Sequence, residues 1–292
     1  MKKTGLFLLA VLTCFTMTSC KSHNSNVRFG AAALGGMYYS FGNTFTQLAG
    51  DNIEGYNFSM KTTAGSAANI RLLSEGYLEL AIGQADMIYD AYNGEGIFEG
   101  KKYTHYTPIA TLYTEACQIV VRDDSSIYTV DDLQDKNVNV GEKESGTLKN
   151  ANDILMACGL NQNIVTLTND DYTSAANKLV SGDIDAMFCT AGVQTTIIEE
   201  LAKKTSIRLI ELDDATLERL ISSYDYYSKY TIPAGTYEGQ TKDVSTIGVK
   251  AVLLSNDKMS SDFNDKIYNF LIASKDALQY SLSVDINIEK IN

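Results

Sequence analysis

Three short segments of glycine, serine and threonine are the best candidates in this chain for binding a small ligand. They are Gly35-Gly36, Thr63-Ala64-Gly65-Ser66 and Ser145-Gly146-Thr147, each placed where an expected strand leads into an expected helix. Such a turn directs backbone N–H groups and the positive end of the helix toward the space above the sheet. A single turn of this kind more often only caps its helix, but three of them predict a site for a carboxylate or a phosphate.

Five other polar side chains are candidates for the same site. Gln84 and Thr190 end two expected strands, and ligands of open α/β sheets bind beyond the carboxyl ends of the strands. Tyr38 and Tyr39 could supply a stacking surface and a hydroxyl group, and Glu115 could accept an ammonium group. Each also has an ordinary structural alternative, namely a turn former, a packed aromatic ring or a solvated carboxylate.

The sequence carries no recognisable catalytic centre. Its two histidines, His23 and His105, belong to no His-x-x-x-His pair, and no Cys-x-x-Cys spacing occurs. The Gly-x-Ser-x-Gly motif is also absent. The glycine-rich segment 94–100 misses the dinucleotide-binding spacing by one residue and falls in an expected loop. We therefore expect no enzyme, no metal ion and no cofactor.

The elements that would position these residues occur in two similar copies. Residues 66–86 and 174–192 each hold a helix that starts at serine, a glycine, a short apolar strand and a polar residue at the strand end. Strands and helices alternate along the chain, which favours a mostly parallel sheet with helices on both faces. No Pro-rich or Ser-rich linker divides the chain, so we predict an α/β protein with two lobes joined by two crossovers.

The same patterns predict the individual elements. Strands are expected at 27–30, 57–62, 80–83, 108–112, 117–122, 137–140, 163–167, 207–212 and 244–254, and helices at 37–48, 66–76, 213–224 and 259–278. A further helix should open at 145–147 and stop at Gly159. Segments 90–106 and 224–237 are expected to be irregular.

Composition limits the function further. The 292 residues are 45% hydrophobic and 21% charged, with a formal net charge of −12. These values are typical of a globular protein, and the acidic balance argues against nucleic acid as a partner. Cys117, Cys158 and Cys189 lie in apolar runs without close spacing, so we expect buried thiols rather than a disulfide framework.

The first residues predict export. Lys2 and Lys3 precede a short apolar run, and small residues lead to Cys20. The run is too short for a permanent membrane span. The segment resembles a bacterial lipoprotein signal, with Met17 where leucine is usual. That resemblance implies cleavage after residue 19, lipidation of Cys20, a polar tether over 20–26 and attachment to the outside of a bacterial membrane, with several acyl chains for a firm anchor.

Several blocks along the chain together carry a second, longer resemblance. The blocks are Gly35-Gly36-Met37-Tyr38-Tyr39, Thr63-Ala64-Gly65-Ser66, Gln84-Ala85-Asp86, Leu112-Tyr113 with Glu115, Gln118–Arg122, Ser145-Gly146-Thr147, Ala191-Gly192 and Ile232–Tyr237. In order and spacing the chain resembles the TAXI family of solute-binding proteins of TRAP transporters, over nearly the whole mature length.

This resemblance implies a type II periplasmic-binding-protein fold that closes over a small carboxylate or an amino acid, such as glutamate or glutamine. It implies delivery to a permease driven by an ion gradient, and we expect a monomer. A receptor for an ATP-driven (ABC) importer and a surface sensor on the same fold are the alternatives. One departure is Leu34, which stands where the family usually has a hydroxyl in the first turn.

We expect lobe 1 at 27–120, lobe 2 at 121–246 and a return to lobe 1 at 247–292. The predicted binding residues are Gly35, Gly36, Tyr38, Tyr39, Thr63, Gly65, Ser66, Gln84, Glu115, Ser145, Gly146, Thr147, Thr190 and Gly192.

Overall fold

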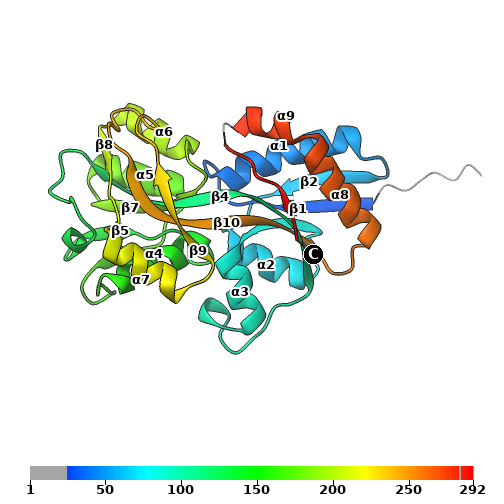
Figure 1. Ribbon diagram of the computed structural model, residues 1–292, viewed down its shortest axis with the longest axis horizontal. Coiled ribbons are helices and arrows are strands. Elements are labelled where there is room, and N and C mark those ends of the chain that lie inside the picture. Colours follow the sequence, from blue (N-terminus) through cyan, green and yellow to red (C-terminus); the bar gives the residue numbers. More distant parts are fainter. Residues whose placement is uncertain (1–24, 283, 292) are drawn as a thin grey trace, which may run out of the picture.

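The computed structural model describes residues 25–282 and 284–291. The expected signal peptide and Cys20 lie outside these residues. Within them, one 11-stranded sheet runs through two α/β lobes that lie side by side (Figure 1). The expected α/β fold class, with two lobes, is therefore confirmed.

Each lobe is built from its own strands and helices. The first lobe contains β1 (Ser25–Gly30), α1 (Met37–Asn52), β2 (Tyr56–Lys61), α2 (Ser66–Ser74), β3 (Leu80–Gln84), α3 (Ala85–Asn93), η1 (Gly96–Phe98), α8 (Ser261–Ala273), α9 (Lys275–Leu282) and β11 (Glu289–Lys290). The second lobe contains η2 (Asp131–Leu133), β5 (Asn137–Asn139), α4 (Gly146–Ala157), β6 (Thr166–Thr168), α5 (Tyr172–Ser181), β7 (Ala186–Ala191), α6 (Thr196–Lys204), β8 (Ile207–Leu209), α7 (Asp214–Ser223) and β9 (Tyr227–Ile232).

Two long strands, β4 (Tyr106–Arg122) and β10 (Val244–Asn256), run through both lobes (Figure 1). They pair with each other antiparallel, while β10 also pairs with β3 and β4 also pairs with β7. Within each lobe the remaining central strands are parallel, β1 with β2 and β3, and β5 with β6 and β7. The crossing strands approach closely because β10 has Gly248, where a Cβ would lie 2.7 Å from Thr114 Cγ2.

Three apolar clusters hold the helices on the sheet. The largest lies on one face of both lobes, where Phe41 and Phe45 of α1 and Leu179 of α5 are fully buried. On the other face, α4 and α7 cover one cluster in the second lobe, and α2 and α3 cover a smaller one in the first lobe. One face of the sheet therefore has a core shared by the lobes, and the other face has two cores.

Several expected elements differ from those observed. The strands expected at 108–112 and 117–122 are one strand, β4, and the expected helix at 259–278 is two helices, α8 and α9. The segment 224–237 is not wholly irregular, because β9 pairs there with β10. Ser25 and Asn26 of the expected tether belong to β1, where they pair with β2. Tertiary pairing with a neighbouring strand, which local patterns do not report, explains the differences at β1, β4 and β9.

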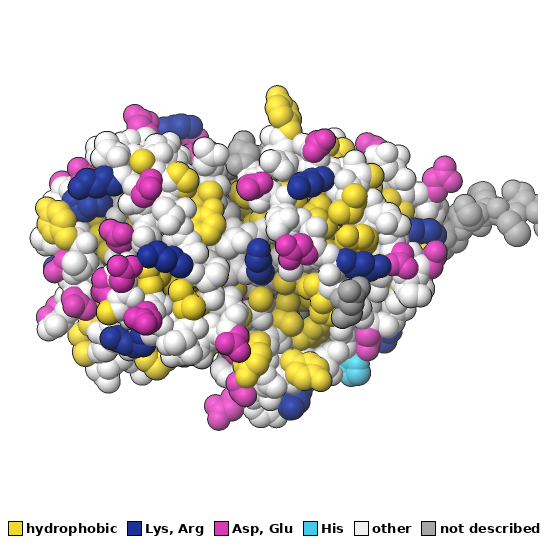
Figure 2. Space-filling model, in the orientation of Figure 1, with side chains coloured by type: hydrophobic (Ala, Val, Ile, Leu, Met, Phe, Trp, Pro, Cys, Tyr) yellow, Lys and Arg dark blue, Asp and Glu magenta, His cyan; other side chains and the backbone are white. Residues whose placement is uncertain are grey.

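The surface carries charges of both signs. On the face drawn in Figure 2, Lys and Arg side chains are interspersed with Asp and Glu over both lobes. Among the described residues, no helix combines the length and apolar character that crossing a membrane requires.

Candidate functional site

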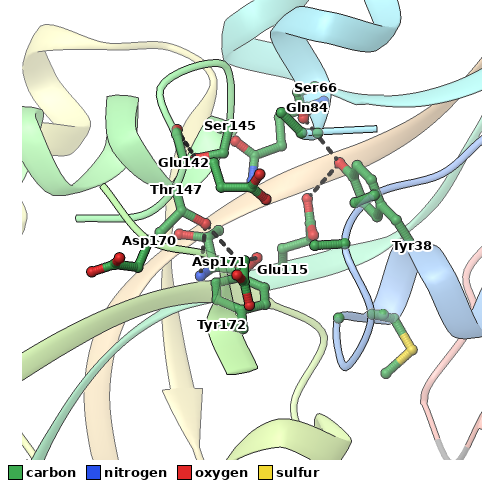
Figure 3. Close-up of a pocket in the computed structure, with 18 residues that line it drawn as sticks. Tyr38, Ser66, Gln84, Glu115, Glu142, Ser145, Thr147, Asp170, Asp171 and Tyr172 are labelled. Carbon is green, nitrogen blue, oxygen red and sulfur yellow. Dashed lines mark hydrogen bonds between the residues drawn. The ribbon is translucent and has the colours of Figure 1, made fainter. Parts of the chain in front are cut away.

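A cavity lies between the two lobes, and its walls come from both. The space between its walls, counted together with the open solvent at its mouth, is about 460 Å³. Figure 3 shows Tyr38, Ser66, Gln84 and Glu115 facing residues of the second lobe across it. The lining residues are Ala32, Ala33, Gly36, Met37, Tyr38, Ala64, Gly65, Ser66, Gln84, Glu115, Glu142, Ser145, Gly146, Thr147, Asp170, Asp171, Tyr172 and Thr190.

Most of the predicted binding residues line this cavity. Those that do are Gly36, Tyr38, Gly65, Ser66, Gln84, Glu115, Ser145, Gly146, Thr147 and Thr190. The other four, Gly35, Tyr39, Thr63 and Gly192, do not line it. Thr63, for example, donates to Asn69 Oδ1 at 2.8 Å, a hydrogen bond within the first lobe. Leu34, the departure in the first turn, is also outside the lining and is 60% exposed.

The first lobe contributes a buried cluster of polar side chains centred on Glu115, near the middle of β4. The Tyr38 hydroxyl, from the first turn of α1, donates to Glu115 Oε2 at 2.8 Å. The same hydroxyl lies 3.4 Å from Ser66 Oγ, and Ser66 Oγ accepts from the backbone N–H of Gln84 at 3.2 Å. Ser66 is the first residue of α2, as the sequence predicts, but it does not cap the helix. Gly65 holds the N-cap position, and the serine hydroxyl joins two lining segments instead.

The shifted pKa values of Glu115 and Tyr38 follow from their burial. Glu115 is 2% exposed. Burial raises the pKa of its carboxyl to about 8, although the Tyr38 hydroxyl and the Gln84 side chain act to lower it. Burial also raises the pKa of Tyr38 well above its usual value, so the hydroxyl keeps its proton and acts as a donor.

The second lobe contributes a pair of hydroxyl groups at the start of α4 and α5. Thr147 Oγ1 lies 2.6 Å from the Tyr172 hydroxyl, which also donates to the Thr190 carbonyl at 3.1 Å. Ser145 caps α4 by accepting from the Leu148 N–H at 3.1 Å. The helix expected to start at Ser174 in fact starts at Tyr172, because the carboxylate of Asp171 accepts from the backbone of Thr173 and Ser174.

Direct contacts close the lobes over one side of the cavity. The N–H groups of Ala67 and Ala68, at the start of α2, donate to the Glu144 carbonyl at 3.1 and 3.4 Å. The Arg71 guanidinium makes a bidentate ion pair with the Glu144 carboxylate. The Thr63–Ser66 turn was expected to offer amides to an anion, but two amides of its helix bind the backbone of the other lobe.

A second set of contacts joins the lobes between α3 and α4. Asn150 Nδ2 donates to Asp86 Oδ2 at 2.8 Å, and Lys149 Nζ lies 3.3 Å from a carboxylate oxygen of both Asp90 and Asp153. Burial raises the pKa of Asp86 to about 7, while Lys149 acts to lower it. These contacts, with those of Glu144, show that the structure is in a closed state.

Four of the chemically important lining residues were missed from the sequence: Glu142, Asp170, Asp171 and Tyr172. Glu142 and Asp170 follow β5 and β6 at the same edge of the sheet as Thr190, which follows Cys189 in β7. Their position just after two parallel strands was a usable signal. It was weak because both strands are only three residues long.

The polar groups that line this site are suited to non-covalent binding. Among the described residues, no group of His, Cys, Asp and Glu is arranged to hold a metal ion. Burial raises the pKa of the Cys117 thiol to about 12 and that of Cys189 further, so both remain protonated near neutral pH. The cavity offers carboxyl groups, hydroxyls, an amide and helix N–H groups for binding a small molecule.

Comparison with solved structures shows the fold of known periplasmic binding proteins. A binding protein component of an ABC phosphonate transporter from Pseudomonas aeruginosa has a TM-score of 0.60 at 11% identity, over 92% of this chain and 82% of that one. The alkanesulfonate-binding protein SsuA from Xanthomonas axonopodis pv. citri, bound to MOPS, has a TM-score of 0.54 at 14% identity, over 89% and 79%. A TctC solute binding protein from Polaromonas has 0.50 at 16% identity, over 91% of each.

The family is established by sequence. A family model matches residues 29–290, which include every residue that lines the cavity. The chain belongs to the NMT1-like family.

Proposed function

We propose that this protein is an extracytoplasmic solute-binding protein that captures a small carboxylate or an amino acid, such as glutamate or glutamine, by closure of its lobes. The observation that carries the proposal is the cavity between the lobes, whose buried polar groups come from both lobes. A ligand held this way bonds to both walls only in the closed state. It therefore shifts the population toward that state, by as much as its affinities for the two states differ.

Delivery to a membrane transporter would complete the function. The residues that resemble the TAXI family favour a TRAP-type permease driven by an ion gradient. The second candidate is an ABC importer, favoured by the similar phosphonate-binding structure, which is an ABC transporter component. The neighbouring genes distinguish the two, because a TRAP system needs a permease without an ATPase and an ABC importer needs both.

The N-terminal residues support a place at the membrane. We propose that residues 1–19 are removed, that Cys20 is lipidated, and that lobes 27–120 and 121–246, with the return at 247–292, stand outside the cytoplasmic membrane. Cys20→Ala should abolish labelling by radioactive palmitate and move the protein from the membrane fraction to the soluble fraction. Unchanged labelling would contradict the lipoprotein assignment.

The test of solute capture is calorimetry and thermal denaturation of the full-length chain, purified in detergent, against amino acids and dicarboxylates. A ligand at about 100 times its Kd should add about 2.7 kcal/mol to the unfolding free energy, which amounts to several degrees in Tm. If no compound in either class gives heat or a Tm shift, solute capture as proposed is wrong.

A further inference from the structure

The charged side chains that line the cavity are all acidic. Four of its lining residues carry carboxyl groups, namely Glu115, Glu142, Asp170 and Asp171, and none of the described lining residues is Lys, Arg or His. An anionic solute would leave water for a cavity in which no lining Lys, Arg or His side chain balances its charge. Burying a charge with no partner of opposite sign costs several kcal/mol per ion.

Two of the four carboxyl groups are already engaged within the second lobe. Lys178 Nζ lies 2.8 Å from both carboxylate oxygens of Asp170. Asp171 accepts from the backbone N–H groups of Thr173 and Ser174 at the start of α5. Glu115 and Glu142 have no ion-pair partner among the described residues, and burial raises the pKa of Glu142 as well as that of Glu115. The cavity therefore has two acidic groups available to a cation.

Two further atoms in the wall lack a partner. Gln84 Oε1 and Thr190 Oγ1 are buried without a hydrogen-bond partner within the described structure, and their residues are 2% and 4% exposed. A carbonyl oxygen can only accept, and a hydroxyl can accept as well as donate. A protonated amine offers three donors and no acceptor, so it complements these atoms together with a carboxylate.

Hydrogen bonds within the protein occupy several of the donors that would favour a second carboxylate on the solute. Ala67 and Ala68 donate to the Glu144 carbonyl, and Leu148 donates to Ser145 Oγ. The first N–H groups of α4, at Gly146 and Thr147, remain as the cavity's positive helix end. These two N–H groups suit one carboxylate of the solute. The hydrogen-bond acceptors in the cavity outnumber them.

We infer that the solute carries a protonated primary amine, held by Glu115 in the closed cavity with Gln84 and Thr190 as further acceptors. This inference rests on the proposed function and narrows it. Among small carboxylates and amino acids, it selects amino acids, and it excludes dicarboxylates that lack an amine.

Binding of an amine beside Glu115 should also release a proton from its carboxyl group. With a pKa of about 8, Glu115 is mostly protonated at pH 7 in the empty closed cavity. An ammonium group beside it favours the ionised carboxylate, so binding should release up to about one proton. The titratable groups that face Glu115 or influence its surroundings are Tyr38 of α1, Asp86 of α3, Tyr113 of β4, Tyr172 of α5 and Cys189 of β7. Of these, Asp86 also has a pKa near neutrality, about 7, so it needs its own control.

The experiment compares matched pairs of ligands on the full-length chain in detergent. L-Glutamate is paired with glutarate, L-glutamine with glutaramate, and each remaining amino acid with the acid that lacks its amine. We expect at least one amino acid to bind, and its deamino partner to bind at least tenfold more weakly. A deamino acid that binds as tightly overturns the amine inference while leaving solute capture intact. No binding by any compound overturns solute capture itself.

The variant Glu115→Gln tests the residue assignment. It should weaken the amino acid at least tenfold, leave the weak binding of the deamino acid unchanged, and abolish proton release in buffers of different ionisation enthalpy. Glu218→Gln, which removes an exposed carboxylate from α7, is the matched control and should bind normally. Asp86→Asn should retain proton release. If Glu115→Gln folds, as far-ultraviolet circular dichroism reports, and still releases the proton on binding, Glu115 is not the group that holds the amine.

Discussion

The Tyr38 hydroxyl donates to Glu115 Oε2 at 2.8 Å, and this bond links the first turn of α1 to the middle of β4. Both residues are almost fully buried and line the cavity between the lobes. The bond fixes the carboxyl group in the wall and leaves its charge state responsive to what enters the cavity.

Tyr38→Phe should weaken solute binding and lower stability. The change removes the donor to Glu115 while keeping the ring, and a buried acceptor that loses its partner costs about 1–3 kcal/mol. Chemical denaturation measures the stability, and calorimetry should show an affinity loss of about tenfold. Tyr39→Phe is the matched control, since Tyr39 does not line the cavity. Equal effects from both variants would show that the Tyr38 hydroxyl has no special role.

Gly146→Ala should prevent full closure. A Cβ at Gly146 would collide with the end of the Gln84 side chain, which is 2% exposed, so either that side chain or the start of α4 has to move. We expect affinity to fall by more than about tenfold, which is about 1.4 kcal/mol, with a larger radius of gyration by X-ray scattering in the presence of solute.

Two controls accompany the Gly146 variant. Gly50→Ala in α1 meets no atom within 4 Å and should bind normally. Gln84→Ala combined with Gly146→Ala should restore closure, as scattering reports, because it removes the side chain that the new Cβ meets. A Gly146→Ala protein that compacts normally with solute would contradict the closed geometry.

Arg71→Ala should weaken binding only modestly. The ion pair with Glu144 joins α2 to the segment before α4, but its side chains are 31% and 33% exposed. Partly exposed pairs contribute about 0.2–1 kcal/mol, so the Kd should rise about two- to fivefold, mainly through faster dissociation, and less at high salt. Stopped-flow dissociation rates at two salt concentrations measure this. An unchanged rate at low salt would mean that the pair does not hold the closed state.

The stability of the ligand-free protein should fall as pH rises between about 4 and 8. The ordinary pKa values of Glu115 and Asp86 are 4.5 and 3.8, and burial raises them to about 8 and 7 in the folded chain. The folded state therefore binds more protons than the unfolded state over this range. The contribution is complete below the ordinary values and is lost as pH rises through the raised ones.

Denaturant unfolding at a series of pH values measures this dependence. Glu115→Gln and Asp86→Asn should each flatten the profile by roughly 1 kcal/mol or more, whereas Glu218→Gln should follow the wild-type profile. If both cavity-side variants keep the wild-type slope, the two carboxyl groups are not the source of the pH dependence.

Much of the fold could be predicted from local patterns. The glycine and serine signals placed the start of α2 within a residue, and the alternation of strands and helices indicated the α/β lobes. Local patterns failed at β9, whose aromatic sequence gives no strand signal and which pairs with β10. They also failed to show that β4 is one continuous strand. Strand pairing over long sequence separations depends on neighbours that a local window does not contain.

The site shows the same division between local and distant information. The sequence by itself determined which turns and polar residues sit at the ends of strands, and therefore eight of the lining residues, because parallel strands place their carboxyl ends at one edge. Only the tertiary structure decided the charge of the cavity. Closure joins the amides of α2 to Glu144, while the folding of the second lobe brings Glu142, Asp170 and Asp171 into the cavity opposite Glu115. The local sequence allowed an anion site, and distant residues brought together by the fold made the cavity acidic.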